Sequence, residues 1–204
     1  MSKGKIKILN SEQGYNLAAS RYDLRAGYLN SFEKSRLLPL LKGVAGKKVL
    51  DVGAGTGRLS GELLKAGAWV TAVDVSERML LILKNKFKKS IATVIGDAER
   101  LPFADAQFDF VVAVFLIVHL KDPIRFFNEA YRVLKPGGKL IITNIHQKEA
   151  PEVPTDQGII KIESYYHRPD KIRETLEELA FQVKEEIFIM EGEIRVNQII
   201  LAKK

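Results

Sequence analysis

An alternation of short apolar runs with helix-like segments, from residue 48 to residue 145, constrains the fold of this chain more than any other feature. The runs typical of buried strands are KVLDVG, AWVTAVDV, IATVIGD, FDFVVAVF and KLIITNI, separated by amphipathic helical patterns or a short loop. Strands that alternate with helices form right-handed βαβ units, which place a parallel sheet between two layers of helices. The sequence therefore predicts an α/β fold with helices on both faces of the sheet.

The two ends of the chain depart from this alternation. Residues 11–42 have a helical pattern, and residues 169–180 have another, followed by two strand-like runs joined only by Glu191-Gly192. Because so short a turn joins antiparallel strands, the mainly parallel sheet is expected to finish with one antiparallel strand. Residues 147–166 fit no repeat unit, and we predict that they elaborate the functional edge of the sheet.

Composition excludes several kinds of chemistry. The 204 residues contain no cysteine, which excludes disulfides, thiolate nucleophiles and cysteine-bound zinc, and no metal site is expected. The longest apolar stretch, residues 110–118, is shorter than a membrane span, and the N-terminus has no signal-peptide pattern, so a cytoplasmic location is the default. The net charge is +7, but the one dense basic cluster, residues 84–89, lies at a helix end that favours it. Nucleic acid is therefore the less favoured partner, and an acidic small molecule suits the charge equally well.

The stretch VLDVGAGTGRLS, residues 49–60, has the order strand, glycine loop and helix that is typical of nucleotide sites. A dinucleotide site has the pattern G-x-G-x-x-G, whereas here the third glycine, Gly57, comes one residue early and Arg58 stands in its place. The Gly-Lys-Ser or Gly-Lys-Thr of a Walker A loop is missing as well. The loop thus indicates close approach to a ligand that offers no phosphate.

Three successive predicted strands end in an aspartate: Asp51, Asp74 and Asp97. In an open α/β sheet, ligands bind at the carboxyl ends of the strands, and an acid about 20 residues past the first glycine accepts hydrogen bonds from ribose hydroxyls. A single aspartate at a strand end is more often a cap or turn residue. Three of them beside a glycine loop favour a nucleoside with a positively charged group.

Four ordered segments resemble class I S-adenosylmethionine-dependent methyltransferases, in the type 11 group that includes ubiquinone and menaquinone biosynthesis methyltransferases. They are VLDVGAGTG, VTAVDVSERML, GDAERLPFADAQFDFVVAVFLIVHLKDP and RVLKPGGKLIITN. The resemblance implies a Rossmann-like seven-stranded sheet of order 3-2-1-4-5-7-6, with strand 7 antiparallel and an N-terminal helical lid. It also implies a single domain made of the lid (1–44), a cofactor-binding core (45–145), a substrate-side insertion (146–168), and a last helix with an antiparallel hairpin (169–204).

The same resemblance implies a set of cofactor contacts. Asp74 would bind both ribose hydroxyls, and Asp97 with the backbone of Ala98 would read the amino edge of the adenine. The other implied contacts are Asp51, Gly53, Ala54, Gly55 and Gly57 around the methionine part, Val75 and Met79 beside the adenine, and Val114 and Phe115 behind the methionine part.

Candidates for the substrate side are fewer. His119 follows the fourth strand, where the substrate should approach, and is the candidate general base. The alternatives are a histidine that only caps or packs locally and a reaction that uses no general base. Tyr22, in the stretch ASRYD, is the candidate lid residue, with packing into the core as its alternative. Further pocket candidates lie after the fifth strand and in the insertion, and they are His146, Tyr166 and His167.

The expected activity is in-line transfer of a methyl group from S-adenosyl-L-methionine to a small-molecule acceptor, which leaves S-adenosyl-L-homocysteine. The loop Asn/Asp-Pro-Pro-Tyr, which in relatives holds the amine of a nucleobase or a glutamine, is missing, which argues against those acceptors. One alternative is a non-catalytic protein that binds the same cofactor. Another is a nicotinamide-dependent oxidoreductase, which the early third glycine and the missing Tyr-x-x-x-Lys dyad count against. The acceptor and the oligomeric state stay open.

Overall fold

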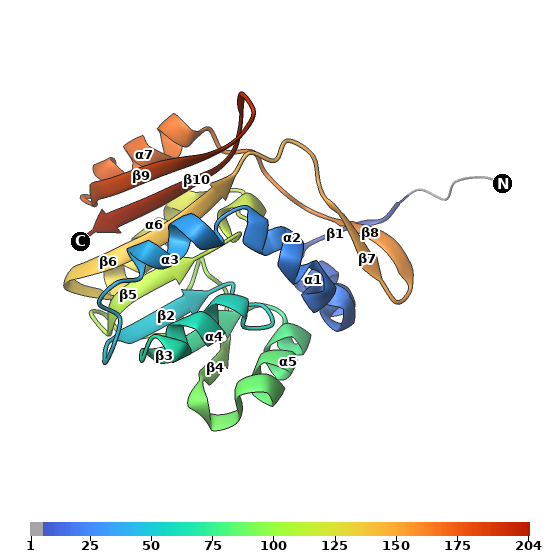
Figure 1. Cartoon of the computed structure of the whole chain (residues 1–204), viewed down its shortest axis with the longest axis horizontal. Helices are drawn as coiled ribbons and strands as arrows, with labels where there is room; N and C mark the ends of the chain where they lie inside the picture. Colours follow the sequence, from blue (N-terminus) through green and yellow to red (C-terminus); the bar gives the residue numbers. More distant parts are fainter. Residues whose placement is uncertain (1–5) are drawn as a thin grey trace.

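A seven-stranded sheet forms the centre of the computed structural model, which describes residues 6–204 (Figure 1). Residues 1–5 of the predicted lid lie outside the described residues. The strands are β2 (Lys48–Val52), β3 (Trp69–Asp74), β4 (Ala92–Ile95), β5 (Phe108–Ala113), β6 (Leu134–Ile145), β9 (Gln182–Glu191) and β10 (Ile194–Lys203). Their order is β4-β3-β2-β5-β6-β10-β9, and β10 runs antiparallel to the other six strands. The predicted order 3-2-1-4-5-7-6 with an antiparallel strand 7 is thereby confirmed.

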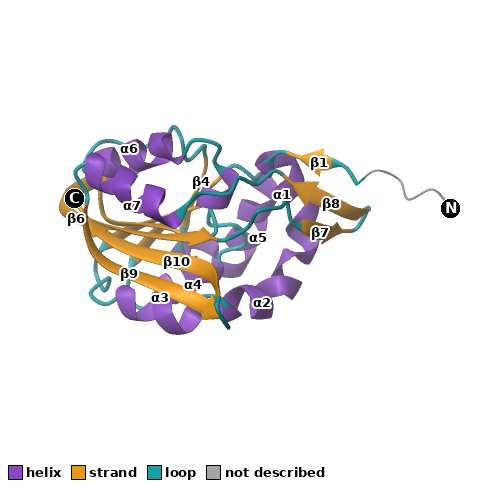
Figure 2. Cartoon of the chain, turned by 90° about the horizontal axis from the view of Figure 1, so that it is seen from above, coloured by secondary structure: helices purple, strands orange, loops and turns teal. Residues whose placement is uncertain are grey.

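Helices cover both faces of this sheet, as predicted. Apolar residues of α6 (Pro123–Val133) and α7 (Pro169–Glu178) pack on one face, and those of α3 (Lys34–Leu40), α4 (Arg58–Lys65) and α5 (Glu77–Phe87) pack on the other (Figure 2). In β5, Val111 and Ala113 face the first layer, whereas Phe110 and Val112 face the second. Because both faces are buried, the central strands read as continuous apolar runs rather than as alternating ones.

Local sequence signals set several element boundaries. The Asp122 carboxylate caps α6 by accepting a hydrogen bond from the Ile124 N–H (3.2 Å), and Pro123 occupies the first helical position. After α4, Gly67 has φ +82° and donates its N–H to the carbonyl of Leu64 (3.0 Å). The fifth predicted strand begins earlier than expected, at Leu134 rather than Lys139, because Leu134 pairs with Phe108 across a shift in register.

The N-terminal segment and the insertion form a second, smaller sheet together. Strand β1 (Ile8–Leu9) pairs parallel with β8 (Gly158–Ile162), which forms a hairpin with β7 (Glu152–Thr155). Helix α1 (Ser11–Tyr22) packs on this sheet through Ala18, next to Leu9 and Ile162 (Figure 1). The sequence analysis expected helices and an elaboration here, but it did not pair two segments about 150 residues apart in the chain.

Helix α1 continues through a short 3-10 turn (Asp23–Arg25) and α2 (Ala26–Ser31) toward α3. Two side chains of this segment, Asn16 and Asp23, bind residues of the glycine loop and of α5 with its N-cap. The Asn16 amide oxygen accepts hydrogen bonds from the Ser76 hydroxyl (2.8 Å) and the Arg78 N–H (3.1 Å). Asp23 accepts one from the Thr56 hydroxyl (2.6 Å) and pairs with Lys86 (2.6 Å). In residues 6–204, no helix has the length and apolar character needed to cross a bilayer.

Candidate active site

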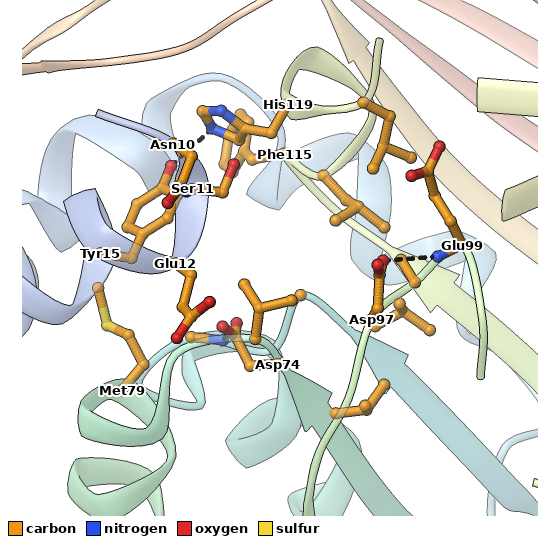
Figure 3. A pocket seen from close by; sticks show the side chains of 18 of the residues that line it. Asn10, Ser11, Glu12, Tyr15, Asp74, Met79, Asp97, Glu99, Phe115 and His119 are labelled. Atoms are coloured by element: carbon orange, nitrogen blue, oxygen red, sulfur yellow. Dashed lines mark hydrogen bonds between the residues drawn. The ribbon is translucent and has the colours of Figure 1, made fainter. Parts of the chain in front are cut away.

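A cavity of about 350 Å³ lies at the carboxyl ends of the central strands, where α1 covers them (Figure 3). Its walls come from the glycine loop after β2, the ends of β3 and β5, the loop after β4, helix α1 and the segment after β8. Nine of the residues predicted to contact a cofactor line it: Gly53, Gly55, Asp74, Val75, Met79, Asp97, Ala98, Val114 and Phe115. The structure thus gathers most of the predicted cofactor residues around one hollow.

The three loop glycines have different tasks. All three have positive φ angles, +70° at Gly53, +55° at Gly55 and +87° at Gly57, which side chains rarely adopt. Gly53 and Gly55 line the cavity, whereas a Cβ on Gly57 would lie only 2.8 Å from atoms of Leu83 and Phe87. The first two glycines therefore leave room for a ligand, and Gly57 allows α4 and α5 to pack closely.

Asp74 joins the end of β3 to the glycine loop. Its carboxylate accepts hydrogen bonds from the backbone N–H of Gly55 (2.8 Å) and of Ser76 (2.8 Å). The side chain is 9% exposed, and its burial raises the pKa of Asp74, although these backbone donors oppose the shift. A buried carboxylate at the cavity wall favours a ligand that brings hydrogen-bond donors or positive charge.

The predicted adenine end lies on the same edge. Met79, in the first turn of α5, is buried, and its N–H is donated to the Ser76 hydroxyl (3.2 Å). Asp97 accepts a hydrogen bond from the N–H of Glu99 (2.9 Å) within the loop after β4, and both residues line the cavity. Figure 3 shows Asp74 and Asp97 on neighbouring parts of the cavity wall.

Asp51, Ala54 and Gly57 are predicted cofactor residues that do not line the cavity. Asp51 lies beneath the loop, 2% exposed, and accepts a hydrogen bond from the Ser60 hydroxyl of α4 (2.6 Å). Burial raises the pKa of Asp51 to about 6. In this structure Asp51 therefore anchors the strand to α4, a contact between a strand end and a helix that spacing alone did not reveal.

Arg58, the residue that replaces the third dinucleotide glycine, reaches away from the cavity. Its guanidinium pairs with the carboxylate of Glu33, which is 1% exposed, and lies 5.4 Å from the ring centre of Phe115. Burial raises the pKa of Glu33 to about 7, although Arg58 opposes the shift. Glu33 could not be predicted as a buried residue, because one glutamate in a helical stretch carries no signal of burial.

The cavity continues beyond β5. Phe115 has a φ of +60°, and its N–H is donated to the Thr143 hydroxyl of β6 (2.8 Å). Non-glycine residues pay a strain cost in this conformation, so neighbouring strands must hold it in place. The bend turns the chain from β5 toward His119, which also lines the cavity.

His119 has both ring nitrogens in hydrogen bonds. Nε2 lies 2.7 Å from the Tyr15 hydroxyl, and Nδ1 lies 2.8 Å from the Glu163 carbonyl oxygen. Burial lowers the pKa of His119, although the Glu163 carbonyl opposes the shift. The ring therefore belongs to a network formed with α1 and the insertion.

The other predicted substrate residues divide. Tyr22 lines the cavity, and its ring lies edge-on to that of Tyr15, with centres 5.8 Å apart. His146, Tyr166 and His167 do not line it. The rings of His146 and Tyr166 contact each other, with centres 4.9 Å apart, and His167 Nε2 bonds the Leu120 carbonyl (2.8 Å).

Several cavity residues were not predicted as site residues. Those that carry polar groups are Asn10, Ser11, Glu12, Tyr15, Glu99, Lys121, Glu163 and Tyr165. Most come from α1 and from the segment after β8, where no motif marked single positions. In residues 6–204, no group of three or more histidine, aspartate or glutamate side chains is placed to hold a metal ion.

Comparisons with known proteins agree with this geometry. Residues 50–142 match the type 11 family described as a methyltransferase domain. The chain is 38% identical to a demethylmenaquinone methyltransferase of Tropheryma whipplei over 134 residues, 63% of this chain and 56% of that protein. It is 33% identical to the ubiquinone/menaquinone biosynthesis C-methyltransferase UbiE of Roseobacter denitrificans over 148 residues, 67% of this chain and 59% of that protein. The chain thus spans less than two thirds of the length of these relatives.

Solved structures show the same fold. An S-adenosylmethionine-dependent methyltransferase from Mesorhizobium loti has a TM-score of 0.74 at 17% identity, covering 86% of this chain and 100% of that one. A possible histamine N-methyltransferase from Thermotoga maritima has a TM-score of 0.70 at 22% identity, covering 94% and 98%. The fold is that of the class I methyltransferases. The family model for a methyltransferase domain of type 11 matches residues 50–142, which include the glycine loop and strands β3 to β5.

Proposed function

We propose that this protein transfers a methyl group from S-adenosyl-L-methionine to a small-molecule acceptor, and that S-adenosyl-L-homocysteine is the second product. The observation that carries the proposal is the cavity itself. It combines a glycine loop without a phosphate-binding lysine with two carboxylates, Asp74 and Asp97, from neighbouring strand ends. Such a rim suits a nucleoside that carries hydroxyl and amino donors and a positive charge.

The residues present fit this cofactor. Space beside Gly53 and Gly55 would take the methionine part, and Val114 and Phe115 would back it. Asp74 would accept hydrogen bonds from the ribose hydroxyls, using lone pairs left beside its two backbone donors. The adenine would lie between Val75 and Met79, and Asp97 and Ala98 would contact its amino edge. When bound, the cofactor supplies a methyl group activated on a sulfonium.

The chain's own contribution is then to orient the two reactants and to exclude water from the cavity. The residues Tyr15, Tyr22 and Phe115 contribute three aromatic rings to the lining of the cavity. Holding two reactants in line can lower a barrier by about 7–11 kcal/mol. The two sequence relatives carry names that refer to demethylmenaquinone and to ubiquinone and menaquinone biosynthesis. For this chain, the size and the lining of the cavity support a small-molecule acceptor.

Calorimetry with S-adenosylmethionine and S-adenosylhomocysteine tests the proposal. We expect saturable binding to the wild-type chain, weakened by more than about 100-fold in Asp74→Asn, because two charge-assisted hydrogen bonds each contribute about 1.5–3 kcal/mol. Asp170→Asn, on an exposed turn of α7, is the matched control and should bind normally. Circular dichroism would verify that both variants are folded.

Each alternative predicts a different result. A wild-type chain that gives no binding heat with either compound would overturn the proposal. Thermal protection by NAD, without protection by S-adenosylmethionine, would indicate an oxidoreductase. Saturable cofactor binding without methylation of any phenol, amine or carboxylate acceptor would indicate a non-catalytic binding protein.

A further inference from the structure

Three segments that are distant in the chain meet at His119. The Tyr15 hydroxyl of α1 lies 2.7 Å from Nε2 (Figure 3). The Glu163 carbonyl oxygen, just after β8, lies 2.8 Å from Nδ1. The rings of Tyr15 and His119 are nearly perpendicular, at 89°, with centres 5.2 Å apart. All three residues line the candidate active site.

The partners determine which ring nitrogen carries the proton. A backbone carbonyl can only accept, so Nδ1 of His119 must be the donor to Glu163. Burial favours the neutral ring, which leaves Nε2 with a lone pair and no proton. Nε2 therefore accepts from Tyr15, and the tyrosine hydroxyl is the donor of that bond.

Backbone contacts hold the Glu163 carbonyl in place. The N–H of Glu163 is donated to the carbonyl of Leu9 in β1 (2.8 Å), and the N–H of Tyr165 is donated to the carbonyl of Val118 (2.7 Å). The insertion is thus fixed on both sides of the atom that sets the histidine tautomer. The pairing of β1 with β8 thereby fixes the position of the carbonyl that binds His119 Nδ1.

We propose that Tyr15 is the catalytic residue that receives the proton of the methyl acceptor, that His119 is a positioning residue that takes up the tyrosine proton, and that the acceptor is a phenol or hydroquinone. The proposal rests on the methyltransferase function proposed above. A tyrosine hydroxyl can give its own proton to His119 Nε2 while it receives the proton of the acceptor, and its ordinary pKa of about 10 is close to that of a phenol, so Tyr15 is suited to relay this proton. The apolar walls at Leu116 and Leu120 suit an aromatic ring.

The step balances as follows. The acceptor O–H bond breaks, its proton bonds to the Tyr15 oxygen, and the Tyr15 proton bonds to His119 Nε2. The electron pair stays on the acceptor as a phenolate, whose oxygen or ring carbon bonds the methyl carbon, and the methyl–sulfur electron pair stays on sulfur. In the carbon case the ring C–H proton then leaves to water. The imidazolium of His119 retains the Glu163 carbonyl as partner and passes its proton to solvent after the transfer.

Nitrogen NMR tests the arrangement without any turnover. The chain contains three histidines, so ¹⁵N-labelled protein gives few ring signals, and the His119→Gln variant identifies the signal of His119. We expect the Nδ1–H tautomer in the wild type, and a changed Nε2 shift in Tyr15→Phe. An Nε2–H tautomer for His119 would overturn the proposal.

Kinetics test the chemical role. The probe is a 2-prenyl-1,4-naphthoquinol kept reduced, with S-adenosylmethionine as donor. Both Tyr15→Phe and His119→Gln should lower kcat by about 10²–10⁴-fold, with the double variant no worse, while the KM for the cofactor stays within threefold. Tyr131→Phe is the matched control and should keep the wild-type kcat. The half-buried ring of Tyr131 packs on Phe181, and neither residue lines the cavity.

Each other outcome has a defined meaning. If Tyr15→Phe keeps the wild-type kcat, whether or not His119→Gln loses it, tyrosine is not the acceptor's partner and the proposal is wrong. A wild-type chain that binds S-adenosylhomocysteine but does not methylate the naphthoquinol overturns the assigned acceptor class and leaves the cofactor proposal standing. A wild-type chain that does not bind S-adenosylhomocysteine contradicts the proposed function itself.

Discussion

The two sides of the cavity are built in different ways. The wall formed by the glycine loop, Asp74 and Asp97 comes from successive strand ends of one parallel sheet. The opposite wall comes from α1, the turn that holds His119 and the segment after β8, which share no motif and meet only in three dimensions. The first wall can be located from the order of strands and helices, and the second requires long-range pairing.

The largest effect that sharpens this comparison is expected at the glycine loop. Gly57→Ala should lower the free energy of unfolding by about 2–5 kcal/mol, because it adds left-handed strain to overpacking against Leu83 and Phe87. Gly43→Ala is the matched control, since its φ is also strongly positive (+84° against +87°) but nothing lies near its Cβ. Urea unfolding measures both. Equal losses in the two variants would show that close packing at Gly57 contributes nothing.

The pair of Arg58, which follows the glycine loop, with the buried Glu33 should make stability depend on pH. The pKa of Glu33 rises from its ordinary 4.5 to about 7 in the folded chain, so the folded state binds this proton more tightly. The free energy of unfolding should therefore fall by up to about 3 kcal/mol as pH rises through this interval, and Asp51 adds to the same trend.

Urea unfolding at pH 5 and pH 8 checks this expectation. Glu33→Gln should lose most of the difference between the two pH values, whereas Glu178→Gln, on the exposed side of α7, should retain it. A wild-type chain that is more stable at pH 8 than at pH 5 would contradict the expected sign.

The smallest effect is expected at the junction of α1 with the small sheet. A Cβ on Gly14 would lie 2.6 Å from Cγ1 of the fully buried Ile162, so Gly14→Ala should open this contact at a local cost of about 1–3 kcal/mol. Limited proteolysis should cut residues 9–22 and 150–165 faster. Gly27→Ala, in α2 with nothing near its Cβ, should leave both segments protected. If Gly14→Ala is cut no faster than Gly27→Ala, the junction tolerates the added methyl group.

Most of the wall formed by the glycine loop, Asp74 and Asp97 could be predicted, because its residues are close together in the sequence or lie at the ends of predicted strands. Gly53, Gly55 and Asp74 lie within or next to strands whose apolar character and spacing are visible in the sequence. Asp51 is the exception: it does not line the cavity, because the Ser60 hydroxyl binds its carboxylate beneath the loop, and its contact with a cofactor stays a prediction. Whether the carboxylate of Asp51 or that of Asp74 lines the cavity depends on the pleat of each strand and on the helix packed against it.

The opposite wall, formed by α1, the His119 turn and the segment after β8, could be predicted only in part. His119 and Tyr22 were identified as candidates, and both line the cavity. The partners of His119, Tyr15 and the Glu163 carbonyl, could not be identified, because a tyrosine in a helical stretch and a backbone oxygen after an irregular segment carry no periodic signal. His146, Tyr166 and His167 share the composition of a pocket but lie outside the cavity wall.

By itself, the sequence determined the α/β alternation, the antiparallel last strand and the acidic rim beside a phosphate-free glycine loop. These features follow from apolar periodicity and from backbone conformations that only glycine adopts readily, and both are properties of neighbouring residues. Only the tertiary structure decided that β1 pairs with β8, and that Tyr15 meets His119 across the cavity. Such contacts depend on how separate elements pack together, because each residue involved could satisfy its hydrogen bonds in many other ways.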